Sequence, residues 1–290
     1  MRIRATVAAV TGALALSALA VPFAQADSQG AAGADKPSAA ERFGSSPAKS
    51  AFSTAAAAAL PTVSNVTVNA GKSIVLGTTT VKTFNVSLTA SHESGIADAY
   101  IDLWHGTDPM EDVDGLFLPN EEVATCTAAS ATTSTCKLTI TADAYNDLFL
   151  NSVAGNWHVT AGVLANDGEI FWDDFHSTHK VQRESKLTVN ASPEPVKKNT
   201  TLTVTGKLTR ANWESSTGAY AGLPSGQSVV LQFRKAGSTT YTNVKGIKTA
   251  SGGALKTTVT ATTDGYWRFT YAGITSTAGS TAAGDYVDVR

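Results

Sequence analysis

The sequence predicts an all-β protein in which two antiparallel β-sandwiches follow one another along the chain. Threonine and other small polar residues dominate the 290 residues, and the aromatic residues are spaced singly along β-favouring runs. Short alternating runs are separated by turns rich in glycine, proline and serine in both halves of residues 61–290. A segment of that length accommodates two domains of about 100 residues each.

Residues 1–26 have the composition of a secretory signal peptide. A short basic stretch precedes an apolar run over residues 5–20, and Ala24-Gln25-Ala26 is a small-x-small site that a leader peptidase accepts. A retained membrane anchor is the alternative, but the run is shorter than the about 20 residues that a bilayer requires. We therefore expect a secreted protein without a membrane span, with Asp27 as its mature N-terminus.

Residues 27–60 form a second N-terminal region, which consists mainly of alanine, serine, glycine and proline. A segment this poor in large side chains buries too little surface to offset the entropy lost on ordering. The sequence therefore predicts a disordered spacer ahead of the first sandwich.

The first predicted sandwich spans residues 61–182. In the run 156–164, Trp157, Val159, Ala161 and Val163 occupy one set of alternating positions, so this face of the strand belongs to a core. The strands expected in this module are 63–68, 83–89, 98–104, 122–127, 135–141, 156–164, 169–172 and 178–182.

The second predicted sandwich spans residues 183–290. Seven short alternating runs in one module match the strand count of an Ig-like sandwich, with a barrel of similar strand number as the alternative. We therefore expect two tandem Ig-like antiparallel β-sandwiches. The strands expected here are 186–190, 200–208, 227–234, 240–247, 254–261, 266–272 and 285–289.

Four segments of the second module resemble bacterial Ig-like domains of proteins secreted by actinobacteria. They are Gly226-Gln-Ser-Val-Val-Leu-Gln-Phe-Arg, Thr240-Tyr-Thr-Asn-Val-Lys, Asp264-Gly265-Tyr266-Trp267-Arg268-Phe269 and Gly284-Asp-Tyr-Val-Asp-Val-Arg. The resemblance implies that Tyr266 locks a corner at the start of a late strand and that Trp267 and Phe269 face the core. It is weaker in the first module, and it implies a fold and a compartment without a function.

The two cysteines of the chain, Cys126 and Cys136, are separated by nine small or polar residues. Two β-runs that meet around such a turn bring cysteine Cα atoms within disulfide range, and an exported protein encounters an oxidising environment. A redox or metal pair is the alternative, but it requires further thiols or nearby histidines. We predict a structural disulfide.

The sequence contains no nucleophile elbow, His-Glu-x-x-His motif, Walker loop or Rossmann glycine pattern. His176 and His179 lie beside Asp173 and Asp174, but residues three apart in a strand point to opposite faces, so a solvated edge is favoured over a metal site. We therefore expect a protein that is not an enzyme.

A further acidic cluster contains Asp108, Glu111, Asp112 and Asp114. Closely spaced carboxylates repel one another unless a cation or solvent lies between them, so a Ca²⁺ site in a loop between strands is one interpretation. An EF-hand match is incomplete, because Met110 stands where the first carboxylate ligand is required. A hydrated acidic loop without any cofactor is the alternative that we favour.

The charge of the chain is divided unequally between the modules. Residues 61–182 contain four lysines, no arginine and fifteen acidic residues, a net charge of −11, whereas residues 183–290 contain thirteen basic and six acidic residues, a net charge of +7. This polarity indicates head-to-tail self-association, or binding of the basic module to an anionic cell-wall polymer, while solvation of both modules is the plainer alternative. The basic residues are scattered without aromatic partners for bases, so we expect no nucleic-acid binding.

A polar loop over residues 210–220 carries Trp213 and Tyr220 outside any strand pattern. Exposed aromatic residues in such a loop form a surface on which a sugar stacks, and the alternative is that Trp213 folds back to cap the sandwich. We expect a secreted, non-catalytic structural or binding protein that acts at the cell envelope or in the extracellular space through protein or polysaccharide contacts. A carbohydrate-binding accessory protein and a secreted inhibitor or effector are the alternatives.

Overall fold

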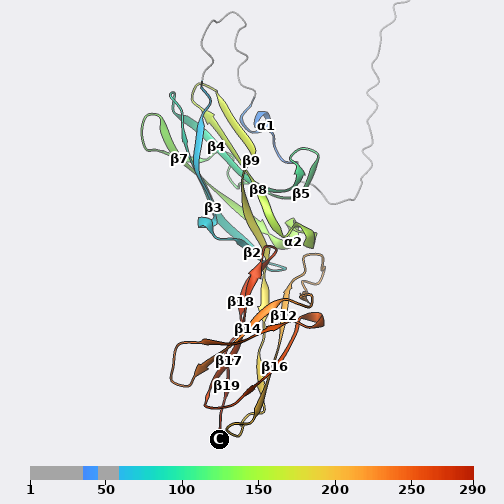
Figure 1. Ribbon diagram of the computed structural model, residues 1–290. Helices are drawn as coiled ribbons and strands as arrows, with labels where there is room; N and C mark the ends of the chain where they lie inside the picture. Colours follow the sequence, from blue (N-terminus) through green and yellow to red (C-terminus); the bar gives the residue numbers. More distant parts are fainter. Residues whose placement is uncertain (1–34, 45–58) are drawn as a thin grey trace, which may run out of the picture. The chain divides into compact units, whose positions relative to one another are not determined.

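Figure 1 shows the computed structural model, which describes residues 35–44 and 59–290. The described chain is nearly all β, which confirms the predicted fold class, and its strands fall into a first module from β1 to β9 and a second from β10 to β19. The predicted signal peptide and residues 27–34 and 45–58 of the predicted spacer lie outside the described residues. No helix in the described ranges is long and apolar enough to cross a membrane.

The first module consists of two antiparallel sheets that share one core. One sheet has the strand order β1-β3-β7-β6, and the other has the order β5-β4-β8-β9, with β2 added parallel to β9. The bounds are β1 (Thr62–Val68), β2 (Ile74–Leu76), β3 (Val81–Ser91), β4 (Ile96–Asp108), β5 (Asp112–Phe117), β6 (Thr125–Ala128), β7 (Thr133–Asp143), β8 (Gly155–Ala165) and β9 (Ile170–Arg183). Short helical turns lie at Asn69–Gly71, Ala144–Asp147 (α2) and Asn151–Val153.

The core face predicted for β8 is confirmed. Trp157, Val159, Ala161 and Val163 are each fully buried and belong to one hydrophobic cluster with residues of the opposing sheet. The Trp157 ring stacks on Phe117 with 4.5 Å between ring centroids, and burying such aromatic surface is a large source of stability.

The outer face of the same sheet is also covered, by residues 35–44. These residues include the helix α1 (Ala39–Phe43), which begins with a capping box between Ser38 and Glu41. Ahead of this helix, the Lys36 side chain is 1% exposed and reaches carboxylates on β4 and β9. The prediction of a disordered spacer over 27–60 is therefore wrong for residues 35–44, because polar and ionic contacts replace the apolar surface that the segment lacks.

The second module also contains two sheet regions. In one sheet β12 pairs with β10, β11, β13 and β16, and in the other the order is β15-β14-β17-β18, with β19 added to β17. β18 also pairs in parallel with β9 at Thr277 and Arg183, so this second sheet continues into the β5-β4-β8-β9 sheet of the first module. The bounds are β10 (Ser185–Leu187), β11 (Asn190–Ser192), β12 (Thr201–Ala211), β13 (Tyr220–Gly222), β14 (Ser228–Lys235), β15 (Thr242–Lys248), β16 (Ala254–Thr260), β17 (Gly265–Ile274), β18 (Thr277–Thr281) and β19 (Asp285–Val287), with a helical turn at Ser251–Gly253.

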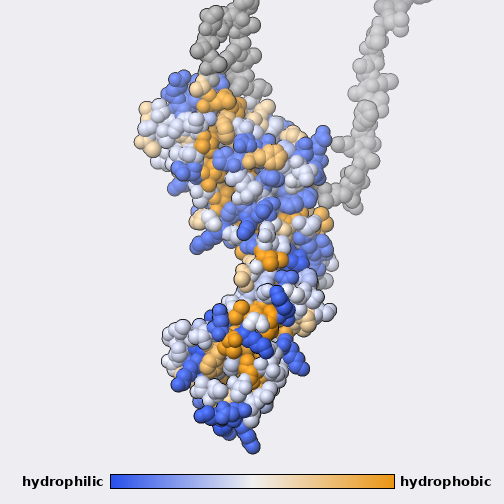
Figure 2. Space-filling view, viewed as in Figure 1, coloured by the Kyte–Doolittle hydropathy of each residue, from blue (hydrophilic) through white to orange (hydrophobic). Residues whose placement is uncertain are grey.

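Alternation along β17 separates the core of the second module from its surface. Trp267 and Phe269 are buried, as the resemblance to bacterial Ig-like domains implies. Tyr266 points to the opposite face, where it contacts Tyr286 and Arg234. These contacts do not lock a corner, so the role that the resemblance implies for Tyr266 is not observed. Figure 2 shows hydrophobic side chains in separate patches on both modules, with hydrophilic side chains between them.

Candidate functional site: an exposed tyrosine–arginine surface

Five side chains on the second module form a surface of aromatic rings and guanidinium groups, which we call the tyrosine–arginine surface. The residues are Arg234 of β14, Tyr241 before β15, Tyr266 and Arg268 of β17, and Tyr286 of β19. Tyr286 is 41% exposed, and the other four are partly exposed.

Strand register brings these side chains together. Because Trp267 and Phe269 enter the core, their neighbours Tyr266 and Arg268 point outward. Arg234 lies directly opposite Tyr266 on one side of β17, and Tyr286 lies opposite Tyr266 on the other side. Cross-strand neighbours on one face are the pairs that interact in a sheet.

The guanidinium groups lie over the tyrosine rings. Arg234 is 3.9 Å from the ring centroid of Tyr266 and 5.3 Å from that of Tyr241, while Arg268 is 3.6 Å from the centroid of Tyr241. The rings of Tyr266 and Tyr286 are 5.1 Å apart. All three cation–ring distances fall within the about 6 Å over which the ring quadrupole attracts a cation.

These contacts orient the two guanidinium groups. Hydrogen bonding to the Tyr241 hydroxyl raises the pKa of Arg234, and Arg268 Nε donates to Gln232 Oε1 at 2.9 Å. A planar guanidinium binds a carboxylate or phosphate through two parallel hydrogen bonds, and a tyrosine offers a flat amphipathic face beside it. The surface thus has the chemistry to bind an anionic ligand that also has an apolar or ring-shaped face.

None of these five residues is among the contacts predicted from the sequence. Alternation alone places Tyr266 and Arg268 on one face of a strand, and this was the available signal. Arg234, Tyr241 and Tyr286 come from three other segments, and only the sheet pairing brings them to the same place.

Trp213 is not available for the predicted sugar contact. Its side chain is buried, with the residue 6% exposed, and its indole Nε1 donates to the backbone oxygen of Gly77 at 2.9 Å. The ring belongs to the hydrophobic cluster of the first module, although Trp213 follows β12 in the second. The structure therefore supports the alternative in which Trp213 folds back, and it corrects the sugar-stacking interpretation.

Tyr220 is similarly engaged. Its hydroxyl donates to the Glu184 carboxylate, and the Lys186 ammonium lies 3.7 Å from the ring centroid. Burial and the Glu184 carboxylate raise the pKa of Tyr220, so the phenol stays protonated at neutral pH. The predicted ligand contact of Tyr220 is corrected as well, because both its hydroxyl and its ring face have partners within the protein.

The predicted Ca²⁺ cluster does not converge. Asp108 Oδ1 accepts from the backbone of Met110 and Glu111, while Asp112 accepts from Thr107 and Asp114 pairs with His105 Nδ1 at 2.5 Å. The segment forms a hairpin of β4 and β5 in place of a loop, and the carboxylates are engaged by these separate local partners. Across the ranges that the structure describes, no group of three or more His, Cys, Asp or Glu side chains is arranged to bind a metal.

The predicted disulfide is confirmed. Cys126 of β6 and Cys136 of β7 lie directly opposite each other in the antiparallel pair, and their sulfur atoms are bonded. The bond therefore fixes a four-residue edge strand to the centre of its sheet.

Comparison with known proteins leaves the function open. A family model described as "Family of unknown function (DUF5707)" matches residues 76–165. No curated protein sequence matches the chain. Similar solved structures include the D0–D1 domain of intimin (17% identity, covering 79% of this chain and 99% of that chain, TM-score 0.25) and a marsupial T cell receptor (11%, 79% and 72%, 0.33). A DUF4785 family protein from Legionella pneumophila gives 14% identity, 73% and 53% coverage and a TM-score of 0.31.

Proposed function

We propose that the protein is a secreted, non-catalytic binding protein whose second module binds an anionic polysaccharide of the cell envelope through the tyrosine–arginine surface. The observation that carries the proposal is the stacking of Arg234 and Arg268 on Tyr241 and Tyr266. Paired guanidinium groups suit carboxylate or phosphate groups of a polymer, and the flat rings suit its sugars.

Charge and compartment support the same function. The net charge of +7 on residues 183–290 attracts an anionic polymer, whereas the acidic first module is repelled by it. The leader-like residues 1–26 and the disulfide fit a protein that works outside the cell.

Sedimentation with isolated anionic cell wall, and with uncharged cellulose and chitin, tests the proposal. We expect binding to the wall alone, and we expect Arg234→Ala/Arg268→Ala to weaken it more than tenfold, because each hydrogen bond to a charged group contributes about 1.5–3 kcal/mol.

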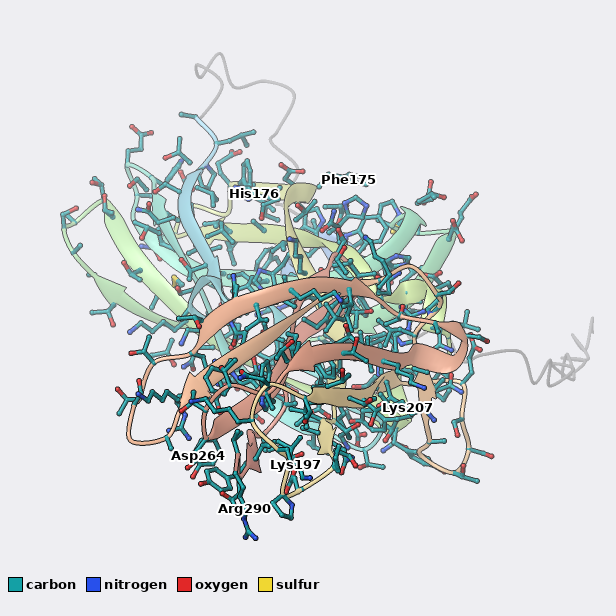
Figure 3. All side chains as sticks on the ribbon, turned by 60° about the horizontal axis from the view of Figure 1, so that its bottom comes forward. Phe175, His176, Lys197, Lys207, Asp264 and Arg290 are labelled. Carbon is teal, nitrogen blue, oxygen red and sulfur yellow. A yellow bond between two sulfur atoms is a disulfide. The ribbon has the colours of Figure 1, made fainter. Side chains whose placement is uncertain are left out.

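A matched control separates this surface from general charge. Lys207→Ala/Lys256→Ala removes the same two charges from exposed positions on β12 and β16 in the other sheet, where Lys207 is labelled in Figure 3. We expect this variant to retain wall binding. Equal losses in the two double variants, or no binding of the wild type to any polymer, would remove the proposal.

A further inference from the structure

Lys36 is a buried lysine that lies between two carboxylates of the first module. Its side chain is 1% exposed, its Nζ contacts Asp174 Oδ1, and Asp102 Oδ2 lies 3.6 Å away. Lysine is almost never fully buried without a partner, since desolvating its charge is costly. This single cation therefore faces two carboxyl groups, of which Asp102 is completely buried and Asp174 is 22% exposed.

Aromatic rings enclose the three groups on the outer face of β4, β8 and β9. Tyr100 and Trp172 stack with 5.1 Å between ring centroids, and Lys36 Nζ lies 5.3 Å from the centroid of the Trp172 ring. Gly162 lies between them in the sheet, where a Cβ atom would come within 2.6 Å of Trp172 Cε3. The glycine thus lets the indole lie against the sheet and shield the lysine from water.

The Asp174 carboxyl group is held and polarised by donors. Its Oδ1 accepts from Trp172 Nε1 at 2.9 Å and from Thr160 Oγ1 at 3.4 Å, in addition to Lys36. Its backbone oxygen accepts from Trp104 Nε1 at 2.9 Å, which fixes the position of this residue just before Phe175 and His176 (Figure 3). Preorganised donors stabilise negative charge that develops on a carboxyl oxygen during nucleophilic attack at its carbon.

Asp102 is the second carboxyl group that faces Lys36. It is completely buried, its Oδ2 accepts from the Tyr100 hydroxyl at 3.0 Å, and its Oδ1 has no hydrogen-bond partner among the residues described. Burial raises the pKa of the Asp102 carboxyl. Because the protonated form is favoured, this carboxyl group can take a proton from a neighbouring donor and pass it on.

We propose that Lys36 and Asp174 condense into an intramolecular amide crosslink, with Asp102 as the proton relay. Asp102 takes a proton from the Lys36 ammonium and passes one to Asp174, which produces a neutral amine and a neutral acid. The Nζ lone pair attacks Cγ of Asp174 and forms the Nζ–Cγ bond. Asp102 then carries a second proton from Nζ to the departing oxygen, the Cγ–O bond breaks and water leaves.

The balance of this step needs no oxidant, reductant or activating cofactor. One amine and one carboxylic acid become one amide and one water molecule, and Asp102 ends in its initial protonation state. Condensation is unfavourable between free molecules in water, but effective molarities of about 10⁵–10⁸ M are reached when reacting groups are held in place. The product ties residues 35–44 covalently to β9, across a sequence separation of 138 residues.

Intact-mass spectrometry of the purified, reduced full-length mature protein tests the crosslink. We expect a mass below that calculated from the sequence by the mass of one water molecule, and a branched peptide joining Lys36 to Asp174 after proteolysis. Lys36→Arg and Asp174→Ala should each restore the calculated mass, whereas Lys72→Arg, at an exposed lysine of the same module, should keep the loss.

A variant of Asp102 tests the proposed relay, and two mass results would contradict the crosslink. Asp102→Asn should fold and leave most molecules uncrosslinked, because the relay is removed while the reacting groups remain. A wild-type mass equal to the calculated mass would overturn the proposal without any variant. A loss of water that persists in Lys36→Arg would also overturn it, since an aspartate ring closure elsewhere in the chain would then be the source.

Discussion

At the scale of single residues, burial sets the protonation of two histidines in the first module. Burial lowers the pKa of His158, with a further contribution from neighbouring His105, and burial likewise lowers the pKa of His179. The His158 ring packs between Trp104 and Phe175, and His179 Nε2 bonds to the backbone oxygen of Lys72 at 3.1 Å. Both side chains are therefore neutral in the folded protein at pH 7.

These shifts predict how stability depends on pH. A histidine pKa that is lower in the folded than in the unfolded state means that acid favours unfolding, since the unfolded chain binds the protons first. We expect the contribution of His158 and His179 to be present above about pH 6.5 and to be lost progressively as the pH falls below it. The free energy of unfolding, measured by urea titration at pH 7.5 and at pH 5.5, gives this contribution.

The double variant His158→Gln/His179→Gln is the control for that experiment. It should lose less stability than the wild type over the same pH interval, because glutamine does not titrate. If the two proteins responded equally to acid, the histidines would not be the groups responsible.

At the scale of elements, the disulfide secures a short edge strand of the first module. β6 has four residues and pairs only with β7 among the strands described, and Cys136 is buried while Cys126 is partly exposed. A short edge strand has few hydrogen bonds with which to hold its place, so the covalent bond replaces missing ladder contacts.

Removing the disulfide should therefore lower the free energy of unfolding. Cys126→Ala/Cys136→Ala should cost about 3 kcal/mol, mainly through the greater freedom of the unfolded chain. Thermal unfolding with and without a reducing agent measures the effect. The reducing agent should destabilise the wild type and leave the double variant unchanged, and an unaltered midpoint in the double variant would contradict the prediction.

At the scale of the whole molecule, the loop after β12 connects the second module to the hydrogen-bond network and the hydrophobic core of the first. Thr78 Oγ1 donates to the Gly218 oxygen at 3.0 Å, and Asn151 Oδ1 accepts from the Trp213 backbone at 3.0 Å. Arg183, at the end of β9, donates to the Ala211 oxygen at 2.5 Å, and burial lowers its pKa to about 10, so it keeps its charge at neutral pH. The modules therefore share buried contacts, while head-to-tail association between molecules stays a prediction.

Trp213 provides the test of this coupling. Calorimetry of the wild type should show one unfolding transition, because the two modules share the Trp213 contacts. Trp213→Ala should cost about 3–5 kcal/mol and separate the transition into two. Trp213→Phe keeps a buried ring without the bond to Gly77 and should cost less. If Trp213→Ala unfolded in one transition at the same temperature as the wild type, the coupling would be ruled out. Polysaccharide binding should be unchanged in either variant.

Local patterns determined the parts of this protein that depend on neighbours in sequence. The alternation of Trp157, Val159 and Ala161 identified a core face, because side chains of a strand point to opposite sides at every step. The polar segment between Cys126 and Cys136 indicated a turn between two β-runs, and such a turn brings the two cysteines within disulfide range. The fold class followed from many such runs.

Only the tertiary structure decided where distant segments meet. Lys36 lies in a segment with the composition of a spacer, and its burial depends on Asp102 of β4 and Asp174 of β9, two strands that flank β8 in the sheet. Trp213 sits in a polar loop, yet a gap in the neighbouring core accommodates its ring. The tyrosine–arginine surface likewise depends on register between four segments. These contacts follow from packing energies between residues far apart in the chain, which no local pattern records.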